Sequence, residues 1–525
     1  MLRARTCLGG MVTAPHHLAA ESGAQVLREG GNAIEAMIAA AATIAVTYPH
    51  MNSIGGDGFW LIALPGRPPI GVQACGPAVG LATPQFYSGD EAIPSRGPRA
   101  ALTVAGAVAG WAEAFALAQG EGGRLPISAL LADAIGYARD GVPVANSLAS
   151  RIVRKWDELE GVPGFQETYA ATGQPAEGAI FKQPKLAATL AQLAEAGLDD
   201  FYRGDLARQF ASGLEAAGSP LRLGDLEAYR AVRAEPLSLG LKGGTIFNMP
   251  PPTQGITSMM ILGIFERLGV TEADGFAHVH ALIEATKHAF IYRNAHLGDP
   301  ERMDPAWRNW LTDDLLRAEA AAIDMARAAP WPPPSQPGDT VWLGAADREG
   351  RVVSYIQSLY WEFGSGFVVP ETGVVWQNRG VSFGLRGGPN ALEPGRFPMH
   401  TLNPALARLD DGRTLAYGTM GGDGQPQTQA AIYSRHVIFG QDMQAAVTAP
   451  RWALGRRWGN EPMNLKVESR FTPDFVDALV KAGHDLDVVE PFDELMGHAG
   501  MVSIDDRGVI SGAADPRADG TCASV

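Results

Sequence analysis

Cysteine and long apolar runs are both scarce in this chain of 525 residues. The three cysteines, Cys7, Cys75 and Cys522, are odd in number and far apart, which argues against a disulfide framework or a zinc knuckle. The most apolar run extends only from Ala36 to Val46. A membrane-spanning helix needs about 20 apolar residues, so this run predicts a buried helix instead.

Positive charge is also in short supply. Lys and Arg number 42 against 57 Asp and Glu, a formal net charge of −15. An acidic surface repels nucleic acid and anionic membranes, so we expect neither as a partner. A small anionic substrate stays compatible with this charge, because one local arginine outweighs a distant field. No apolar stretch follows the basic residues Arg3 and Arg5, so we find no secretory signal and expect a cytoplasmic protein.

Helical patterns fill the earlier part of the chain and strand patterns fill the last third. Apolar spacing predicts helices over residues 18–28, 33–46, 184–197, 206–218 and about 275–295. Residues 329–338 contain five prolines and predict an extended linker. After the linker, residues 340–346 and 351–359 flank a turn and predict a β-hairpin. We therefore expect a mixed α/β (α+β) fold.

Two glycine motifs resemble a nucleophile elbow and a nucleotide-binding loop, but the residues next to them in the sequence do not favour either function. Gly380-Val-Ser382-Phe-Gly384 matches the G-x-S-x-G pattern of a nucleophile elbow, but helix-breaking residues follow it, so we predict a plain loop. Residues 55–58 (GGDG) precede a strand instead of opening a helix, which fails the nucleotide-binding context. These glycines more simply indicate close backbone approach or a positive φ.

Histidines gather on the helix predicted over residues 275–295. His280, Glu284 and His288 are spaced four residues apart, so they share one face of the helix, and their side chains are of types that bind metal ions. His278 precedes them. No H-E-x-x-H motif is present. We therefore predict a solvated polar face that happens to contain histidine, and no metal site.

Thr340 is the most informative single position, because it begins a strand directly after the proline-rich linker. A threonine hydroxyl is a poor nucleophile unless a base lies beside it. Cleavage between Asp339 and Thr340 would create that base, an α-amine with a pKa of about 7.7–8.0. The alternative is a threonine that simply starts a β-hairpin. Further along, Gly421 and Gly422 follow a strand-like run and could offer N–H groups to an oxyanion.

Short motifs along nearly the whole chain together resemble the γ-glutamyltranspeptidase family of N-terminal-nucleophile hydrolases. They are GMVTA (10–14), GGNA (30–33), GGDGF (55–59), MPPP (249–252), LGDP (297–300), FGSG (363–366), GG (421–422), APR (449–451) and DPR (515–517). The resemblance implies an α-β-β-α sandwich made as a precursor that cuts itself once. It implies segments 1–339 and 340–525, the first ending in the linker 329–338 and the second beginning with the nucleophile.

The same resemblance assigns the catalytic roles. The nucleophile falls on Thr340, the oxyanion hole on Gly421 and Gly422, and a hydroxyl that hydrogen-bonds the nucleophile on Ser358. The cleavage site falls between Asp339 and Thr340. No metal or organic cofactor is implied.

The chain departs from the family pattern where the family binds its amino-acid substrate. The family's carboxylate-binding arginine is Gln73 here, and its amine-binding acidic residue is Ser382. Its asparagine is Tyr360, and its paired serines are His400 and Thr401. A charged ligand group without its partner costs about 2–5 kcal/mol. We therefore expect the chemistry to be kept and the γ-glutamyl specificity to be lost.

The variant motifs resemble the oxamate amidohydrolase branch of the family. They lie at residues 338–343, 361–366, 376–380, 400–404 and 421–427. Oxamate has no α-amine, which agrees with the loss of the acidic partner. Its carboxylate still needs a cation, for which Arg99, Arg379 and Arg396 are candidates, and the latter two are favoured because they lie in or near matched segments.

These arguments predict a self-cleaving amidohydrolase that acts on a small acidic amide such as oxamate through an acyl-enzyme. Three alternatives stay open: a γ-glutamyl hydrolase or transferase acting on glutathione, an acylase for glutaryl-type side chains, and an uncleaved binding protein without catalysis. We expect the two segments to stay paired after cleavage, with a dimer of that pair left open.

Overall fold

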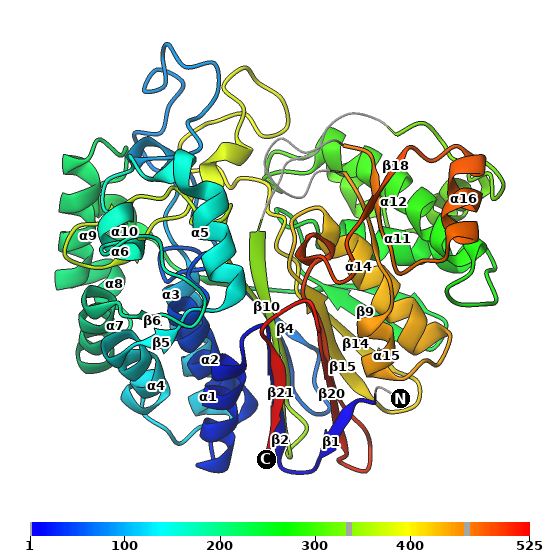
Figure 1. Cartoon of the computed structure of the whole chain (residues 1–525), viewed down its shortest axis with the longest axis horizontal. Helices are drawn as coiled ribbons and strands as arrows, with labels where there is room; N and C mark the ends of the chain where they lie inside the picture. The colour runs from blue at the N-terminus through cyan, green and yellow to red at the C-terminus, as the bar shows by residue number, and fades with distance from the viewer. Residues whose placement is uncertain (1–2, 332–338, 456–462) are drawn as a thin grey trace.

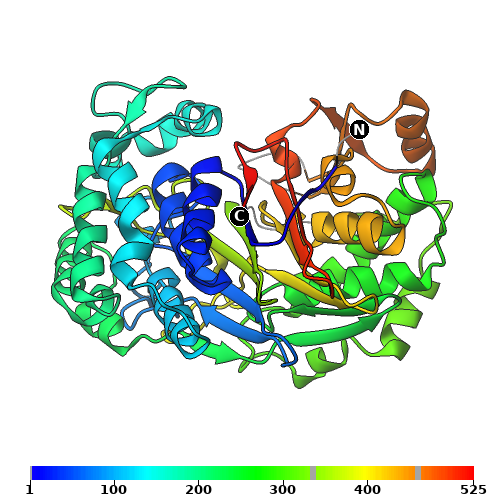
Figure 2. The same ribbon diagram turned by 90° about the horizontal axis from the view of Figure 1, so that it is seen from below.

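Two antiparallel sheets form the centre of the molecule. The computed structural model describes residues 3–331, 339–455 and 463–525, so most of the predicted linker lies outside the described residues. Each sheet has seven strands, ordered β21-β2-β10-β11-β3-β4-β7 in sheet I and β1-β20-β19-β15-β14-β9-β8 in sheet II. Figure 1 shows the strands between two groups of helices, and Figure 2 shows the same layers from below.

The strands of sheet I are β2 (Gly10–Ala14), β3 (Asp57–Ala63), β4 (Ile70–Ala74), β7 (Val232–Ala234), β10 (Asp339–Asp347), β11 (Val352–Tyr360) and β21 (Thr521–Ser524). The strands of sheet II are β1 (Arg5–Cys7), β8 (Leu237–Leu241), β9 (Gly244–Asn248), β14 (Ala405–Leu409), β15 (Thr414–Thr419), β19 (Ala499–Ile504) and β20 (Ile510–Ala514). Smaller sheets contain β5 (Val142–Pro143), β6 (Ile180–Phe181), β12 (Val368–Val369), β13 (Val374–Val375), β16 (Trp452–Leu454), β17 (Leu465–Glu468) and β18 (Leu486–Val489).

Helices cover the outer face of each sheet. The helices before residue 235 are α1 (His17–Arg28), α2 (Ala33–Thr47), α3 (Ala107–Gly120), α4 (Ile127–Asp140), α5 (Asn146–Leu159), α6 (Phe165–Tyr169), α7 (Pro184–Ala196), α8 (Asp200–Arg203), α9 (Asp205–Ala216) and α10 (Leu223–Ala228). The later helices are α11 (Gly255–Arg267), α12 (Phe276–His296), α13 (Asp313–Ala321), α14 (Gly424–Tyr433), α15 (Met443–Thr448) and α16 (Pro473–Ala482).

These bounds confirm the helices and the hairpin predicted from periodicity. Asn32 caps α2, and its side chain and that of Glu35 form a capping box. The run from Ala36 to Val46 is buried within α2. Within the described residues, no helix is both long and apolar enough to cross a bilayer.

Three apolar clusters account for the layers. One joins the outer face of sheet I to helices such as α2, and a second joins sheet II to α11 and α12. A third lies between the sheets and includes Phe59, Trp342 and Ile356 of sheet I with Leu406 and Val502 of sheet II. The α-β-β-α sandwich is therefore confirmed.

The indole of Trp342 requires close approach of the opposite sheet. A Cβ atom added to Gly418 would lie 2.2 Å from this ring, and one added to Gly500 would lie 2.4 Å from it. The indole N–H also donates to Ser354 Oγ at 2.9 Å. Glycine at these two positions of sheet II therefore lets the sheets meet around a tryptophan two residues from Thr340.

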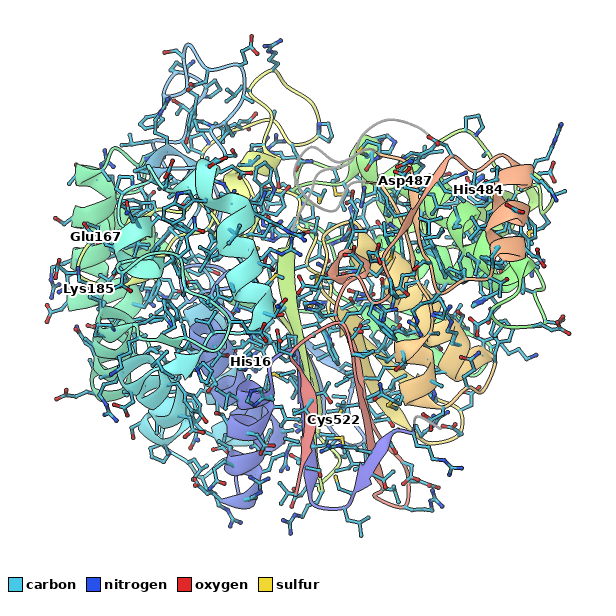
Figure 3. The ribbon with its side chains drawn as sticks, in the orientation of Figure 1. His16, Glu167, Lys185, His484, Asp487 and Cys522 are labelled. Carbon is cyan, nitrogen blue, oxygen red and sulfur yellow. The ribbon has the colours of Figure 1, made fainter. Side chains whose placement is uncertain are left out.

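The three cysteines are free thiols. Cys75 and Cys522 are buried, and Cys522 lies on β21 among the strands in Figure 3. Thr13 Oγ1 donates a hydrogen bond to the Cys522 sulfur at 3.0 Å.

Candidate active site

Thr340 lies on β10 in the middle of sheet I, with its side chain on the face that meets sheet II. It is completely buried, and its Oγ1 donates to Ser358 Oγ at 3.4 Å. Gln425 Nε2 donates to Thr340 Oγ1 at 3.3 Å. The β10–β11 register shifts between Asp339 and Val341, so the ladder is irregular at this threonine. Ser358 is thus beside Thr340, in the position that the resemblance implied.

The glycine pair lies in the turn between β15 of sheet II and α14. Gly421 has φ +109° and Gly422 has φ +47°, both in the region that favours glycine. The turn closes through Gly424 N–H donating to the carbonyl of Gly421 at 2.7 Å and Gln425 N–H donating to that of Gly422 at 3.2 Å. Gln425, three residues after Gly422, also contacts Thr340. The turn that contains the predicted glycine pair therefore leads directly to a residue in contact with the threonine.

A buried ion pair supports this turn. Arg293 on α12 donates to Asp423 Oδ1 at 2.6 Å and to Gln254 Oε1 at 2.9 Å. Gln254 Nε2 in turn donates to the carbonyl of Gly422 at 2.8 Å. Both charged side chains are completely buried. Sequence reasoning missed Arg293 and Gln254. Helix periodicity does not distinguish Arg293 from the other polar residues of α12, and Gln254 lies outside the motifs, directly before α11.

Arg379 is the candidate cation of the site. Its guanidinium stacks on Tyr360 with the carbon 4.0 Å from the ring centroid, and Nη1 donates to Thr401 Oγ1 at 3.4 Å. Its Nε and Nη2 find no partner within the described residues. Burial lowers the pKa of Arg379 to about 10, while Tyr360 and Asp57 act to raise it. The group stays protonated at neutral pH, and its two unpartnered nitrogens suit an anion.

The other two candidate arginines are already engaged. Arg99 pairs with Asp90 at 2.6 Å on a partly exposed surface. Arg396 donates to the carbonyl of Ala391 at 3.0 Å and lies 3.6 Å from Glu393. The structure therefore favours Arg379 over both.

His400 lies beside the same arginine. Both of its ring nitrogens are unpartnered within the described residues, and the ring packs edge-on against Phe59 with centroids 5.1 Å apart. Burial, with the Arg379 charge, lowers the pKa of His400 well below its usual value, so the imidazole is neutral. Its backbone is fixed by hydrogen bonds to Pro252 and Gln254 at 2.8 Å each.

Asp57 is a site residue that sequence reasoning did not single out. Its Oδ2 lies 3.8 Å from His400 Nε2, and its Oδ1 accepts from Gln377 Nε2 at 3.0 Å and from Gly106 N–H at 3.2 Å. Burial raises the pKa of Asp57 to about 7, against the opposing effect of Arg379. The GGDGF motif was the sequence signal for Asp57. Its glycines indicated close packing of the backbone, and such packing holds the residue between them in a fixed place.

The glycines of that motif do serve close approach. A Cβ atom on Gly55 would lie 2.3 Å from the Val375 carbonyl oxygen, and one on Gly56 would lie 2.2 Å from that of Ser358. Any side chain there would push the strand bearing Asp57 away from its neighbours.

The two remaining predicted positions lie at the edge of this group. Ser382 is buried at the end of the short turn that begins at Arg379, and its hydroxyl finds no hydrogen-bond partner within the described residues. Gln73 is half-buried on β4. No helix follows directly after Ser382, which confirms that the G-x-S-x-G match is a loop and not a nucleophile elbow.

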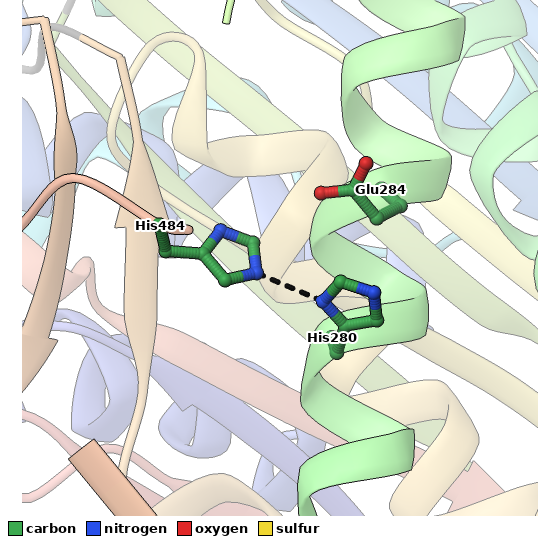
Figure 4. Close-up of side chains that lie close together, drawn as sticks. All are labelled: His280, Glu284 and His484. Atoms are coloured by element: carbon green, nitrogen blue, oxygen red, sulfur yellow. Dashed lines mark hydrogen bonds between the residues drawn. The ribbon is translucent and has the colours of Figure 1, made fainter. Parts of the chain in front are cut away.

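The prediction of a solvated histidine face on α12 is wrong. His278, His280 and Glu284 are buried. His280 hydrogen-bonds His484 at 2.8 Å, as Figure 4 shows, and its other ring nitrogen bonds the carbonyl of Asp324 at 3.0 Å. Helix periodicity could not reveal the distant segments that cover this face.

His280, Glu284 and His484 form a possible metal-ligand set within the described residues, with ligand atoms all within 4.8 Å of one another. His288, which the spacing placed with them, instead contacts Glu319 at 2.6 Å. Lys287 Nζ already supplies a cation to Glu284 at 2.7 Å, and Ala329 N–H donates to the other carboxylate oxygen at 2.9 Å. These contacts satisfy the carboxylate without a metal ion.

Two antiparallel sheets between helical layers are the architecture of the N-terminal-nucleophile hydrolases. The sequence profile of gamma-glutamyltranspeptidase matches residues 19–525. The chain belongs to the gamma-glutamyltranspeptidase family and is an amidohydrolase of this class.

Individual relatives extend over the whole chain. An oxamate amidohydrolase proenzyme of Klebsiella pneumoniae is 53% identical over 519 residues, which cover 98% of each chain. A glutathione hydrolase-like YwrD proenzyme of Bacillus subtilis is 38% identical, again over 98% of each chain. The crystal structure of a cephalosporin acylase from Bacillus halodurans has a TM-score of 0.91 and 33% identity, covering 100% of this chain and 97% of that one.

Proposed function

We propose that this chain cleaves itself between Asp339 and Thr340 and that Thr340 then hydrolyses a small acidic amide such as oxamate. Cleavage would give a large segment, 1–339, and a small segment, 340–525, that remain paired. Both segments supply strands to both sheets, which favours continued pairing.

The position of the Thr340 hydroxyl carries this proposal. It lies between Ser358 Oγ and Gln425 Nε2, at 3.4 Å and 3.3 Å. The Gly421–Gly422 pair precedes Gln425 along the chain, separated from it by Asp423 and Gly424. A hydroxyl partner contacts the proposed nucleophile directly, and the proposed oxyanion donors belong to the turn that leads to its other contact, Gln425.

In the first reaction, Thr340 Oγ attacks the carbonyl carbon of Asp339 and loses its proton. The Asp339–Thr340 C–N bond breaks as the Thr340 nitrogen takes up a proton, which leaves an ester between the two residues. Water then hydrolyses that ester. The products are a carboxylate on Asp339 and a free α-amine and hydroxyl on Thr340.

In the second reaction, the α-amine of Thr340 takes the proton from its own hydroxyl as Oγ attacks the substrate amide carbon. The N–H groups of Gly421 and Gly422 stabilise the oxyanion, where losing one donor typically costs about 10²–10³ in rate. The α-ammonium returns the proton to the leaving nitrogen, and ammonia departs. Water hydrolyses the remaining ester, so oxamate gives oxalate and ammonia.

The acidic specificity rests on Arg379. A buried guanidinium with two unpartnered nitrogens suits a carboxylate, because charge-assisted hydrogen bonds are strong there. The relative that is 53% identical bears the name oxamate amidohydrolase, which supports the same substrate class.

A second candidate is hydrolysis of a longer acyl amide that ends in a carboxylate. It is supported by the likeness to a cephalosporin acylase with a TM-score of 0.91. Such a substrate would also use Arg379 and would also need no amine-binding acidic residue. It differs from oxamate in the distance between the carboxylate and the scissile amide.

Ammonia release from purified protein tests the proposal. Oxamate, glutaramate, glutamine and glutathione are supplied separately, with amine release followed for glutathione, and denaturing electrophoresis of the same sample shows whether the chain is cleaved. We expect two bands and the highest kcat/KM with oxamate. Preference for glutaramate would support the second candidate, and preference for glutathione or a single inactive band would overturn the proposal.

A further inference from the structure

Several buried polar atoms around Arg379 and His400 lack a partner in the part of the chain that the structure describes. They are Oδ2 of Asp57, Nε and Nη2 of Arg379, and both ring nitrogens of His400. All three side chains are completely buried. Buried polar groups in native proteins are nearly always hydrogen-bonded, so a cluster of exceptions indicates where a polar ligand binds.

Asp57 is built into the sheet at this point. On β3 it pairs with Ser358 of β11, and Ser358 contacts Thr340. Its Oδ1 is held by Gln377 and Gly106, which leaves Oδ2 directed toward His400 Nε2 at 3.8 Å. A carboxyl group therefore lies one strand away from the hydroxyl that contacts the nucleophile.

We propose that Asp57 determines how strongly this site binds an anionic substrate, because its carboxyl group and the substrate carboxylate act on the same Arg379 guanidinium. This inference rests on the proposed function. With Asp57 neutral, the whole Arg379 charge is available to the ligand. With Asp57 ionised, part of that charge is compensated and the ligand carboxylate meets a like charge.

Asp57 changes from its protonated to its ionised form within a pH range in which binding can be measured. Burial raises the pKa of Asp57 to about 7, and Arg379 is the nearby group that opposes this most.

The other titratable groups that interact with Asp57 stay neutral there. Burial raises the pKa values of Cys75, Tyr202, Tyr229 and Tyr355 and lowers that of His400. Burial also raises the pKa of Tyr360, the ring that stacks on Arg379, so ionisation of Asp57 is the change that alters the charge facing Arg379.

Protonation of Asp57 strengthens the binding of an anion. Asp57 is mostly protonated below pH 7 and mostly ionised above it, so binding of an anion weakens as the pH rises. If binding requires the protonated form, the affinity falls about tenfold one pH unit above the pKa.

Calorimetric binding of oxalate to the purified wild-type protein and to Asp57→Asn tests this inference. Asparagine keeps the shape, and its Oδ1 still accepts from Gln377 and Gly106. Between pH 6 and pH 8 we expect the wild type to lose about tenfold more affinity than Asp57→Asn. The Thr340 amine titrates in both proteins, so the difference between them isolates Asp57. Equal losses in the two proteins, or no oxalate binding by either, would overturn the inference.

Asp347→Asn is the matched control, since Asp347 is a buried aspartate at the opposite end of β10, paired with Arg351 at 3.0 Å. We expect it to keep the wild-type pH dependence of oxalate binding; loss of that dependence would contradict the inference. Ammonia release from oxamate is measured on the same samples. Asp57-dependent binding without ammonia release would refute the proposed function and leave the inference standing, whereas ammonia release with equal pH losses would do the reverse.

Discussion

At the scale of single residues, the candidate site is defined by polar side chains that are completely buried. Thr340 is completely buried beside Ser358, and Arg379 is completely buried with unpartnered N–H groups. The unpartnered nitrogens of Arg379 do not benefit stability by themselves, because burying polar groups without full hydrogen bonding costs free energy. Such groups are expected where a ligand or a reaction supplies the missing partners.

The first prediction concerns the nucleophile. Thr340→Ala removes the only oxygen of the side chain, so we expect one uncleaved band on denaturing electrophoresis and no ammonia release from oxamate. Thr340→Ser keeps a hydroxyl and should restore cleavage at a reduced rate. Normal cleavage or turnover in the alanine variant would refute the assignment of Thr340.

The second prediction separates binding from stability at Arg379. Arg379→Met removes the charge and keeps much of the volume, so KM for oxamate should rise by about 30-fold or more, equivalent to at least about 2 kcal/mol. The thermal midpoint should stay the same or rise, because an incompletely bonded buried charge is lost.

Steady-state kinetics and thermal unfolding of the same preparations check it. Arg396→Met tests the competing candidate, for which we expect an unchanged KM. A KM increase in Arg396→Met instead would move the carboxylate site to that residue.

At the scale of elements, the meeting of the two sheets depends on glycines opposite Trp342. The ring occupies the place that side chains at Gly418 and Gly500 would need. Large rings in a packed core are compensated by small residues on the facing layer. The same contact fixes β10, the strand that carries Thr340.

Gly418→Ala is therefore expected to lower the free energy of unfolding by about 1–3 kcal/mol through overpacking. Urea unfolding followed by fluorescence measures this change. Gly240→Ala is the matched control, since Gly240 lies on β8 of the same sheet and nothing lies within 4 Å of an added Cβ. Equal stability of the two variants would show that the Trp342 ring does not require glycine at position 418.

At the scale of the whole molecule, the cleavage proposed at Asp339–Thr340 would divide both sheets between two chains. β10 and β11 of the small segment lie between β2 and β3 of the large segment in sheet I. In sheet II, β9 of the large segment pairs with β14 of the small one. His280 and His484 add a hydrogen bond across the same division.

We accordingly expect cleaved protein to elute as one species in gel filtration and to separate into two chains only under denaturing conditions. The physical reason is that separation would expose two sheet edges and the apolar layer between the sheets. Native mass spectrometry gives the stoichiometry. Elution of the segments as separate species would contradict this expectation.

The sequence by itself determined the elements and the reactive residue types. Helix and strand periodicity is local, so α2, α12 and the β10–β11 hairpin were predictable, as was a glycine pair suited to an oxyanion. Resemblance to a family then supplied the sandwich and the partner Ser358. Thr340 as nucleophile stays a prediction.

Only the tertiary structure decided what surrounds those residues. It identified Asp57 and Arg293, separated Arg379 from the engaged arginines, and buried a histidine face expected to be solvated. The reason is physical: desolvation and pairing depend on segments far apart in sequence, and no local pattern records which segment will cover a given side chain.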